Sequence, residues 1–362
     1  MVRHRLHRGI RKIERIAAGM GIMRGTILSG EMESFVRRGL CLGAAAFRCV
    51  AVYGGGSDRD FYRILYGSNE SAILMRYGRA REENGFYVRI AEFLRSIGIR
   101  VPRIYHHSPE QGLVLMEDLG EVSLWMLRLA PEEVRMKYYK RALKEICTLH
   151  AFPADAFPIE TVPLMEGFGP ALYRWERDYF RINFVAGFCR IDHGSYDAGL
   201  LEEELDALAG RLEKTGRSLI HRDFQSQNLM VLRDGIALID FQGMRYGTCF
   251  YDLGALLYDP YAALTEMERM ELLSYYYTIS GSGMKWTEFQ KCFREAAAQR
   301  LMQALGAFGF LGLNQGKKDF LGHIPSGVEN LIDAAGRSGR LPQLKLLALN
   351  CRTAVLLGKG EK

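Results

Sequence analysis

The first third of the chain alternates short apolar runs with glycine-containing turns, a pattern typical of an antiparallel sheet. Apolar side chains then recur at helical spacing over residues 80–97, and Gly98 with the following Pro102 ends that helix. This part of the chain therefore predicts a small sheet with one helix, the strands being residues 47–53, 61–65, 71–76 and 112–116.

Helical spacing dominates from Pro131 onward. Helices are expected at residues 131–150, 172–182 and 196–214, and again from Leu253 to the end. The exception is Asp234-Gly235, a strong hairpin-turn signal, which joins two short apolar runs at residues 229–232 and 236–239. A small antiparallel sheet followed by a mostly helical remainder predicts an α+β fold.

The composition fits a soluble, folded chain of two parts. Its 362 residues are 48% hydrophobic and 25% charged, and no apolar run is long enough to cross a bilayer. Seven cysteines without a Cys-x-x-Cys pair indicate unpaired thiols in a reducing compartment, so a cytoplasmic location is expected.

The net charge of +6 is concentrated near the N-terminus. Residues 1–50 hold ten Arg or Lys against three Asp or Glu, so the rest of the chain is close to neutral. Such a basic segment can touch nucleic acid or an anionic membrane, but a solvated helix face is the more common outcome. We therefore expect no nucleic-acid partner.

The hairpin brings candidate chemistry together. Asn228 enters its first strand and Asp240 leaves its second, so both lie at the same end, and Asp223 precedes Asn228 by five positions. Phosphoryl transfer from ATP needs a carboxylate that orients the attacking hydroxyl, and oxygen ligands for the Mg²⁺ that bridges the phosphates. Asp223 suits the first, catalytic role, whereas Asn228 and Asp240 suit the second.

These motifs resemble those of a known superfamily. His221-x-Asp223-x4-Asn228, followed by Asp240-Phe241-x-Gly243, resembles the catalytic and metal loops of protein-kinase-like enzymes. Gln225 replaces the lysine usual in protein kinases, and Tyr251-Asp252-Leu253 instead resembles the aminoglycoside phosphotransferase and choline kinase group. Within that group the segments 54–63 and 116–120 look most like bacterial N-acetylmuramate and N-acetylglucosamine 1-kinases.

The resemblance, which covers about residues 45–330, implies a two-lobed protein-kinase-like fold that uses ATP and Mg²⁺. Its small antiparallel-sheet lobe would bind the nucleotide, and its larger, mostly helical lobe would carry catalysis and the substrate. The corresponding division of the chain is a basic extension at 1–44, an N-terminal lobe at 45–118 and a C-terminal lobe at 119–362.

The nucleotide would meet three segments of the N-terminal lobe. The loop containing Gly55, Gly56 and Ser57 offers backbone N–H groups to phosphates. Kinases of this fold place a phosphate-binding lysine on the third strand, where this chain has Arg76, with Glu83 or Glu92 of the next helix as its expected partner. Adenine would meet the end of the last strand, at Met116, Glu117 and Leu119.

The sequence specifies the substrate that accepts the phosphate less closely than the nucleotide site. Glu176, Arg177 and Arg245 are candidate substrate residues, whereas Trp175 is assigned to the core and Asp252 to capping its helix and anchoring the metal loop. The resemblance implies an amino-sugar kinase, and the near-neutral body agrees with a neutral or anionic substrate. An aminoglycoside or choline/ethanolamine kinase, or a nucleotide-binding pseudokinase without turnover, are the alternatives.

Overall fold

The computed structural model describes residues 26–52 and 59–358, which form two compact units. The first unit comprises the described residues up to Glu145 together with Pro158–Met165 and Asn228–Gly243; the second comprises Ile146–Phe157, Glu166–Gln227 and the described residues from Met244. The predicted phosphate loop with Gly55, Gly56 and Ser57 lies outside the described residues, as does most of the basic N-terminal segment.

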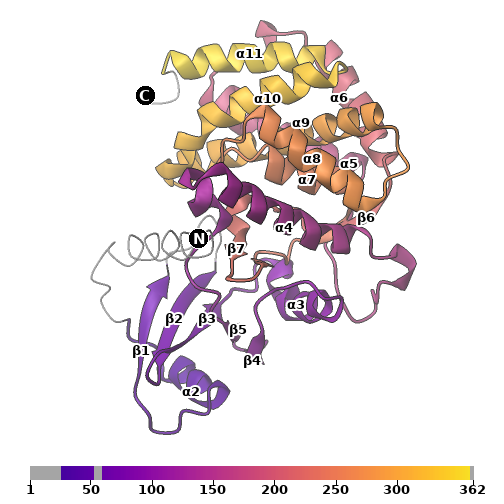
Figure 1. The fold of residues 1–362 in the computed structure, drawn as a ribbon. Coiled ribbons are helices and arrows are strands. Elements are labelled where there is room, and N and C mark those ends of the chain that lie inside the picture. The colour runs from indigo at the N-terminus through magenta and orange to yellow at the C-terminus, as the bar shows by residue number, and fades with distance from the viewer. Residues whose placement is uncertain (1–25, 53–58, 359–362) are drawn as a thin grey trace. The chain divides into compact units, whose positions relative to one another are not determined.

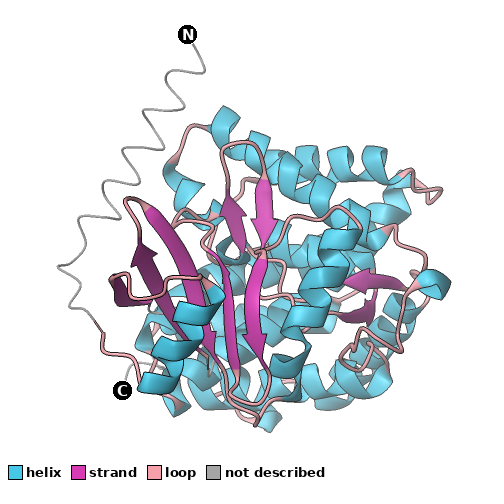
Figure 2. Cartoon of the chain, turned by 90° about the horizontal axis from the view of Figure 1, so that it is seen from below, coloured by secondary structure: helices cyan, strands magenta, loops and turns pink. Residues whose placement is uncertain are grey.

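A five-stranded antiparallel sheet forms the centre of the first unit (Figures 1 and 2). Its strand order is β1-β2-β3-β5-β4, the strands being β1 Phe47–Val52, β2 Asp60–Tyr66, β3 Glu70–Arg76, β4 Ile104–Ser108 and β5 Leu113–Glu117. Gly112 precedes β5 with φ +64°, and a Cβ there would lie 2.3 Å from the Tyr77 carbonyl oxygen. Only glycine allows this close turn back into the sheet.

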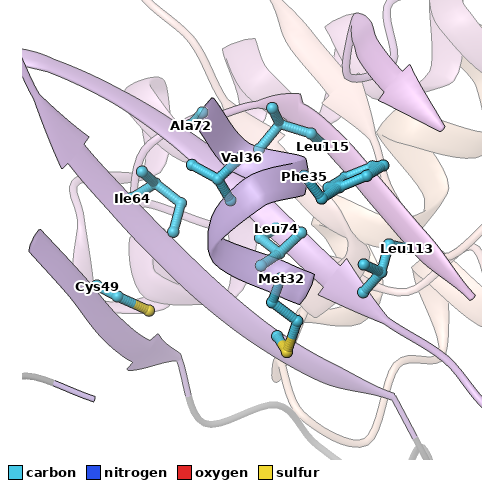
Figure 3. Packing of buried hydrophobic residues seen from close by; sticks show 9 residues of the cluster. All are labelled: Met32, Phe35, Val36, Cys49, Ile64, Ala72, Leu74, Leu113 and Leu115. Carbon is cyan, nitrogen blue, oxygen red and sulfur yellow. The ribbon is translucent and has the colours of Figure 1, made fainter. Parts of the chain in front are cut away.

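Helix α2 (Gly30–Gly39) packs on one face of this sheet (Figure 3). Its residues Met32, Phe35 and Val36 lie one helical turn apart and point toward Ile64, Leu74 and Leu115 of the strands. Phe35 and Val36 are completely buried. Residues 30–39, which the sequence analysis assigned to a basic extension, therefore contribute to the core of the first unit.

The predicted helix and hairpin both belong to the first unit. A 3₁₀ turn η1 (Glu82–Phe86) leads into α3 (Tyr87–Ser96), and the hairpin consists of β7 (Leu229–Val231) and β8 (Ile236–Leu238). The Leu238 N–H donates to the Arg100 carbonyl (2.8 Å), and the Tyr87 ring stacks on Phe241 at 4.7 Å. These contacts fix the hairpin against the segment around α3.

The second unit is mostly helical. Its chain begins at the C-terminal turn of α4 (Glu132–His150) and continues through α5 Pro170–Phe180, the π-helical segment η4 Arg181–Phe188, α6 Ala198–Glu213, α7 Cys249–Leu257, α8 Glu266–Ser280, α9 Trp286–Gly309, α10 Ile324–Ser338 and α11 Pro342–Leu356. A short antiparallel pair, β6 (Ser218–Ile220) and β9 (Arg245–Gly247), precedes α7. The predicted combination of a small antiparallel sheet with a helical majority is confirmed.

Across the part of the chain that the structure describes, no helix has the length and apolar character needed to cross a membrane.

Candidate active site

Asn228 and Asp240 meet at one end of the hairpin, as the sequence pattern predicts. Asn228 ends a short 3₁₀ turn, η6 (Ser226–Asn228), just before β7, and its carbonyl accepts a hydrogen bond from the Ile239 N–H (3.0 Å). The Asn228 side-chain amide lies 3.5 Å from Oδ2 of Asp240. Asp240 has φ +64°, a left-handed conformation that is uncommon for residues other than glycine and tends to occur at functional sites.

Arg59 is a close neighbour of Asp240 that the sequence analysis missed. Its Nη2 donates to Oδ1 of Asp240 at 2.5 Å, and its side chain is only 8% exposed. The same Oδ1 accepts a hydrogen bond from Nε2 of Gln242 (3.0 Å). Arg59 and Asp240 are 181 positions apart in the sequence, so no local pattern could have indicated this contact.

The donor set around Asp240 fits a hard divalent cation. Mg²⁺ is usually held by one or two protein carboxylate or amide oxygens and completes its octahedral coordination with phosphates and waters. Asn228 and Asp240 provide such a pair, and the contact with Arg59 shows that Asp240 already accepts a positive charge at close range. These residues would hold Mg²⁺ together with nucleotide phosphates.

Asp223 lies in the second unit, between two guanidinium groups. Its carboxylate accepts a hydrogen bond from Nη1 of Arg222 (2.7 Å) and lies 3.5 Å from Nη2 of Arg300. Desolvation opposes ionisation, but the charges of Arg222 and Arg300 outweigh it and lower the pKa of Asp223 to about 2. The side chain remains 21% exposed, so it is ionised and accessible at neutral pH.

Two buried carboxylates hold the backbone of the loop that carries Asp223. Asp252 is fully buried and accepts hydrogen bonds from the N–H groups of His221 (2.7 Å) and Arg222 (2.8 Å). Asp259 accepts the Ser226 N–H (2.8 Å) on the other side of Asp223. The loop is thus fixed at both ends, which restricts the position of the carboxylate between them.

The role predicted for Asp252 needs correction. Thr248 caps α7, since its side chain accepts the Phe250 N–H, whereas Asp252 lies inside the first turn and its carboxylate holds the backbone of His221 and Arg222. The carboxylate also contacts Nε2 of His150 (3.1 Å). The sequence signal was an acidic residue within an otherwise apolar helix, which is costly unless its oxygens are bonded.

Two of the predicted substrate residues, Glu176 and Arg245, are buried near Asp223. Glu176 accepts hydrogen bonds from Tyr251 (2.7 Å) and Gln299 (2.9 Å), and burial raises its pKa. Burial and repulsion from Arg222 lower the pKa of Arg245, which is 7% exposed. Arg222, Arg245 and Arg300 thus lie among Asp223 and Glu176 in this part of the second unit.

The third predicted substrate residue, Arg177, is 4% exposed and forms an ion pair with Asp206 (2.8 Å). The neighbouring Trp175, which the sequence analysis assigned to the core, is instead 51% exposed and stacks on Tyr179 with ring centroids 5.1 Å apart. The assignment of Trp175 to the core is thus wrong, because the buried face of α5 lies against α9 at Glu176 and Phe180.

Arg76 does not have the partner that was predicted for it. Asp60 and Arg76 face each other across β2 and β3, and Oδ2 of Asp60 accepts hydrogen bonds from Nε (3.0 Å) and Nη2 (2.5 Å) of Arg76. Glu83 instead lies 3.7 Å from Arg81. The sheet register therefore pairs Arg76 with Asp60 rather than with Glu83 or Glu92, and leaves its side chain 53% exposed.

The segment expected to meet adenine begins at the end of β5. Met116 is buried and accepts a hydrogen bond from the Tyr87 hydroxyl, while Leu119 is partly buried. Desolvation would raise the pKa of Glu117, but hydrogen bonds from the Arg100 guanidinium and the Arg103 N–H lower it overall. The Glu117 side chain is therefore ionised and engaged within the first unit.

Two groups of predicted site residues are brought together, one in each unit. The first unit joins Asn228 and Asp240, with Arg59 as an additional neighbour, and the second unit joins Asp223, Glu176 and Arg245. The approach of Asp223 to the metal ligands remains a prediction from the five-residue spacing.

Comparison with known proteins gives a consistent result. The family model described as "Phosphotransferase enzyme family" matches residues 50–288. A protein of Pseudomonas aeruginosa named N-acetylmuramate/N-acetylglucosamine kinase is 24% identical over 300 residues, covering 81% of this chain and 86% of its own. A protein of the same name from Neisseria meningitidis is 24% identical over 296 residues, covering 80% and 86%.

Solved structures share the fold at low sequence identity. A spectinomycin phosphotransferase in complex with ADP and spectinomycin has a TM-score of 0.59 at 15% identity, covering 87% of this chain and 99% of its own. Choline kinase LicA from Streptococcus pneumoniae has a TM-score of 0.54 at 16% identity, covering 84% and 100%. The predicted protein-kinase-like fold is thereby confirmed. Because the family match spans well over half of the chain and includes Asp223, Asn228 and Asp240, this protein belongs to the phosphotransferase enzyme family and is a small-molecule kinase.

Proposed function

We propose that this kinase transfers the γ-phosphate of ATP to a hydroxyl of an amino sugar, with Asp223 orienting that hydroxyl and Asn228 and Asp240 holding Mg²⁺. The observation that carries the proposal is the contact between Asn228 and Asp240 at one end of the hairpin, twelve residues apart in sequence. When bound, Mg²⁺ supplies positive charge that neutralises the phosphates.

Asp223 would act mainly by positioning. A carboxylate whose pKa is about 2 is ionised at neutral pH but is a weak base, so it accepts a hydrogen bond from the hydroxyl without removing the proton in advance. In a loose phosphoryl-transfer transition state the attacking oxygen gains acidity only as its bond to phosphorus forms. The carboxylate would then accept the proton late, while Asp252 and Asp259 keep the loop still.

The charge around Asp223 favours an uncharged or anionic acceptor. The charges of Arg222 and Arg300 act directly on Asp223, so a cationic group beside this carboxylate would meet like charges. A cationic alcohol such as choline or an aminoglycoside would be repelled by these charges. The relatives named N-acetylmuramate/N-acetylglucosamine kinase agree with an amino-sugar acceptor.

The remaining parts of the nucleotide site follow from the resemblance. We propose that the loop with Gly55, Gly56 and Ser57 covers the phosphates, and that backbone groups from Met116 to Leu119 receive adenine. The seven free cysteines agree with a reducing compartment, for which we propose the cytoplasm.

An acceptor panel tests the proposal. Purified protein with ATP and Mg²⁺ is offered N-acetylglucosamine, N-acetylmuramate, kanamycin and choline, and sugar phosphate is followed by ³¹P NMR. We expect turnover with at least one amino sugar, and loss of turnover in Asp240→Asn. Turnover with kanamycin or choline alone would contradict the proposed acceptor, and ATP binding without turnover on any acceptor would contradict the catalytic proposal itself.

A further inference from the structure

We propose that Arg59 is the cation that binds the nucleotide's phosphates, in the role that other kinases of this fold give to a third-strand lysine, and that Asp240 holds Arg59 in place until the nucleotide arrives. This inference rests on the proposed function, because it assumes that Asp240 serves the phosphate end of ATP. Arg59 thus takes the phosphate-binding role that the position on the third strand alone assigned to Arg76.

The contact with Asp240 is the first support. Nη2 of Arg59 lies 2.5 Å from Oδ1 of Asp240, the carboxylate that is proposed to hold Mg²⁺. A group at this position is close to where the phosphates must lie if Asp240 reaches them through a bridging cation. Arginine recognises phosphate with two parallel N–H donors, so the same guanidinium can bind either a carboxylate or a phosphate group.

Burial is the second support. The Arg59 side chain is 8% exposed, and its Nε is buried without a hydrogen-bond partner among residues 26–52 and 59–358. A buried donor without a partner is unfavourable, and a phosphate oxygen would supply the missing acceptor on binding. The ion pair with Asp240 thus leaves Nε of Arg59 without an acceptor, as expected for a guanidinium that also binds a ligand.

The backbone of Arg59 gives it a defined position. Arg59 directly precedes β2, which pairs with β1 on one side and β3 on the other, and its guanidinium lies over the Phe61 ring at 6.0 Å. A cation attached to the start of an inner strand loses little further conformational freedom when it binds an anion. Arg76 is attached to the end of β3 but is 53% exposed and paired with Asp60, itself 50% exposed, so its pairing is weak and screened.

The pairing also predicts a competition. Arg59 neutralises Asp240, so a divalent cation that binds Asp240 must displace the guanidinium. Phosphate oxygens would then compensate the displaced positive charge of Arg59. Arg59 should therefore weaken metal binding to the empty protein but strengthen nucleotide binding.

The test measures these two affinities separately, without any turnover. ATP binding is measured by calorimetry in EDTA and with Mg²⁺, and Mn²⁺ binding to nucleotide-free protein is measured by electron paramagnetic resonance. The variants are Arg59→Gln and Arg59→Lys, with Arg76→Gln as the matched control that removes the same charge from the neighbouring strand.

We expect Arg59→Gln to weaken metal-free ATP binding about 10- to 100-fold, the size of one lost charge-assisted contact, and to tighten Mn²⁺ binding several-fold. Arg59→Lys should lie between wild type and Arg59→Gln for both ligands, and Arg76→Gln should change either affinity less than about twofold. A structural role for Arg59 would instead lower both affinities together with the melting temperature.

Three results would overturn the inference: unchanged metal-free ATP binding in Arg59→Gln, loss of ATP binding in Arg76→Gln instead, or parallel loss of ATP and Mn²⁺ binding in Arg59→Gln. If Arg59→Gln shows the expected opposite changes while wild type phosphorylates no acceptor, the inference stands and the proposed function fails. The two failures are therefore distinguishable.

Discussion

Replacing Asp252 by asparagine should destabilise the second unit and disturb the catalytic loop at the same time. The carboxylate is fully buried and bonds three groups: the N–H of His221 at 2.7 Å, the N–H of Arg222 at 2.8 Å and Nε2 of His150 at 3.1 Å. Asparagine has the same shape but only one acceptor oxygen. Its NH₂ group would face at least one of these backbone donors.

The magnitude follows from these bonds. One backbone N–H left without an acceptor in a buried site costs about 1–3 kcal/mol, and the loss of charge assistance from the other bond adds about 1 kcal/mol. We therefore expect the free energy of unfolding to fall by about 2–4 kcal/mol. Because the same two N–H groups fix the residues directly before Asp223, kcat should fall at least tenfold even where the protein remains folded.

Urea unfolding followed by circular dichroism measures the first effect, and steady-state kinetics at low urea measures the second. Asp197→Asn is the matched control, because Asp197 caps α6 at an exposed position where asparagine caps equally well. If the free energy of unfolding of Asp252→Asn lies within about 0.5 kcal/mol of the wild-type value, the change is no larger than that of a surface substitution, and the reasoning is refuted.

Three further changes test other parts of the structure. Phe35→Ala empties a fully buried position on α2 and should lower the free energy of unfolding by about 3–5 kcal/mol, measured by urea titration; an unaffected midpoint would mean that α2 is not part of the core. Gly254→Ala would place a Cβ 2.7 Å from Cα of Ala297, so α7 and α9 must separate, and we expect a loss of about 1–3 kcal/mol by thermal melting. Asp223 has a folded-state pKa of about 2, below its value of 3.8 when unperturbed, so its stabilising effect is complete above pH 4 and is lost as the pH falls toward 2. Wild type should accordingly lose about 1 kcal/mol more stability than Asp223→Asn between pH 5 and pH 3, and an equal loss in both proteins would contradict that pKa.

Local patterns predicted the elements whose causes are local. The Asp234-Gly235 turn and the apolar runs beside it specify the hairpin, and the hairpin alone brings Asn228 to Asp240. The helix ending before Gly98 was predicted for the same reason, since Gly98 adopts φ +86° just past it.

Contacts between distant segments could not be obtained in this way. The partner of Arg59 lies 181 positions away, and the partner of Arg76 depends on the register between β2 and β3, which the sequence pattern did not fix. The helix α2 is a different case. Met32, Phe35 and Val36 carry a clear helical spacing. The high positive charge of the surrounding segment, however, is more typical of a solvated extension than of a core helix.

The burial of charged residues was the hardest feature to predict. Asp252, Asp259 and Glu176 are almost completely inaccessible, and each is bonded to backbone N–H groups or to side chains from other helices. Composition cannot distinguish a buried carboxylate with partners from an exposed one. Only the tertiary arrangement shows that these acids hold the loop around Asp223 and the side chains beside it.

The rate of phosphoryl transfer in Asp223→Asn tests the central claim most directly. With ATP, Mg²⁺ and the acceptor that supports the fastest turnover in wild type, single-turnover measurements should show a rate lower by about 10²- to 10⁴-fold, the range for loss of a group that orients and accepts the proton. The far-ultraviolet circular dichroism and the ATP affinity should remain close to those of wild type. A rate within about tenfold of wild type in the folded variant would mean that Asp223 does not orient the acceptor, and would contradict the account.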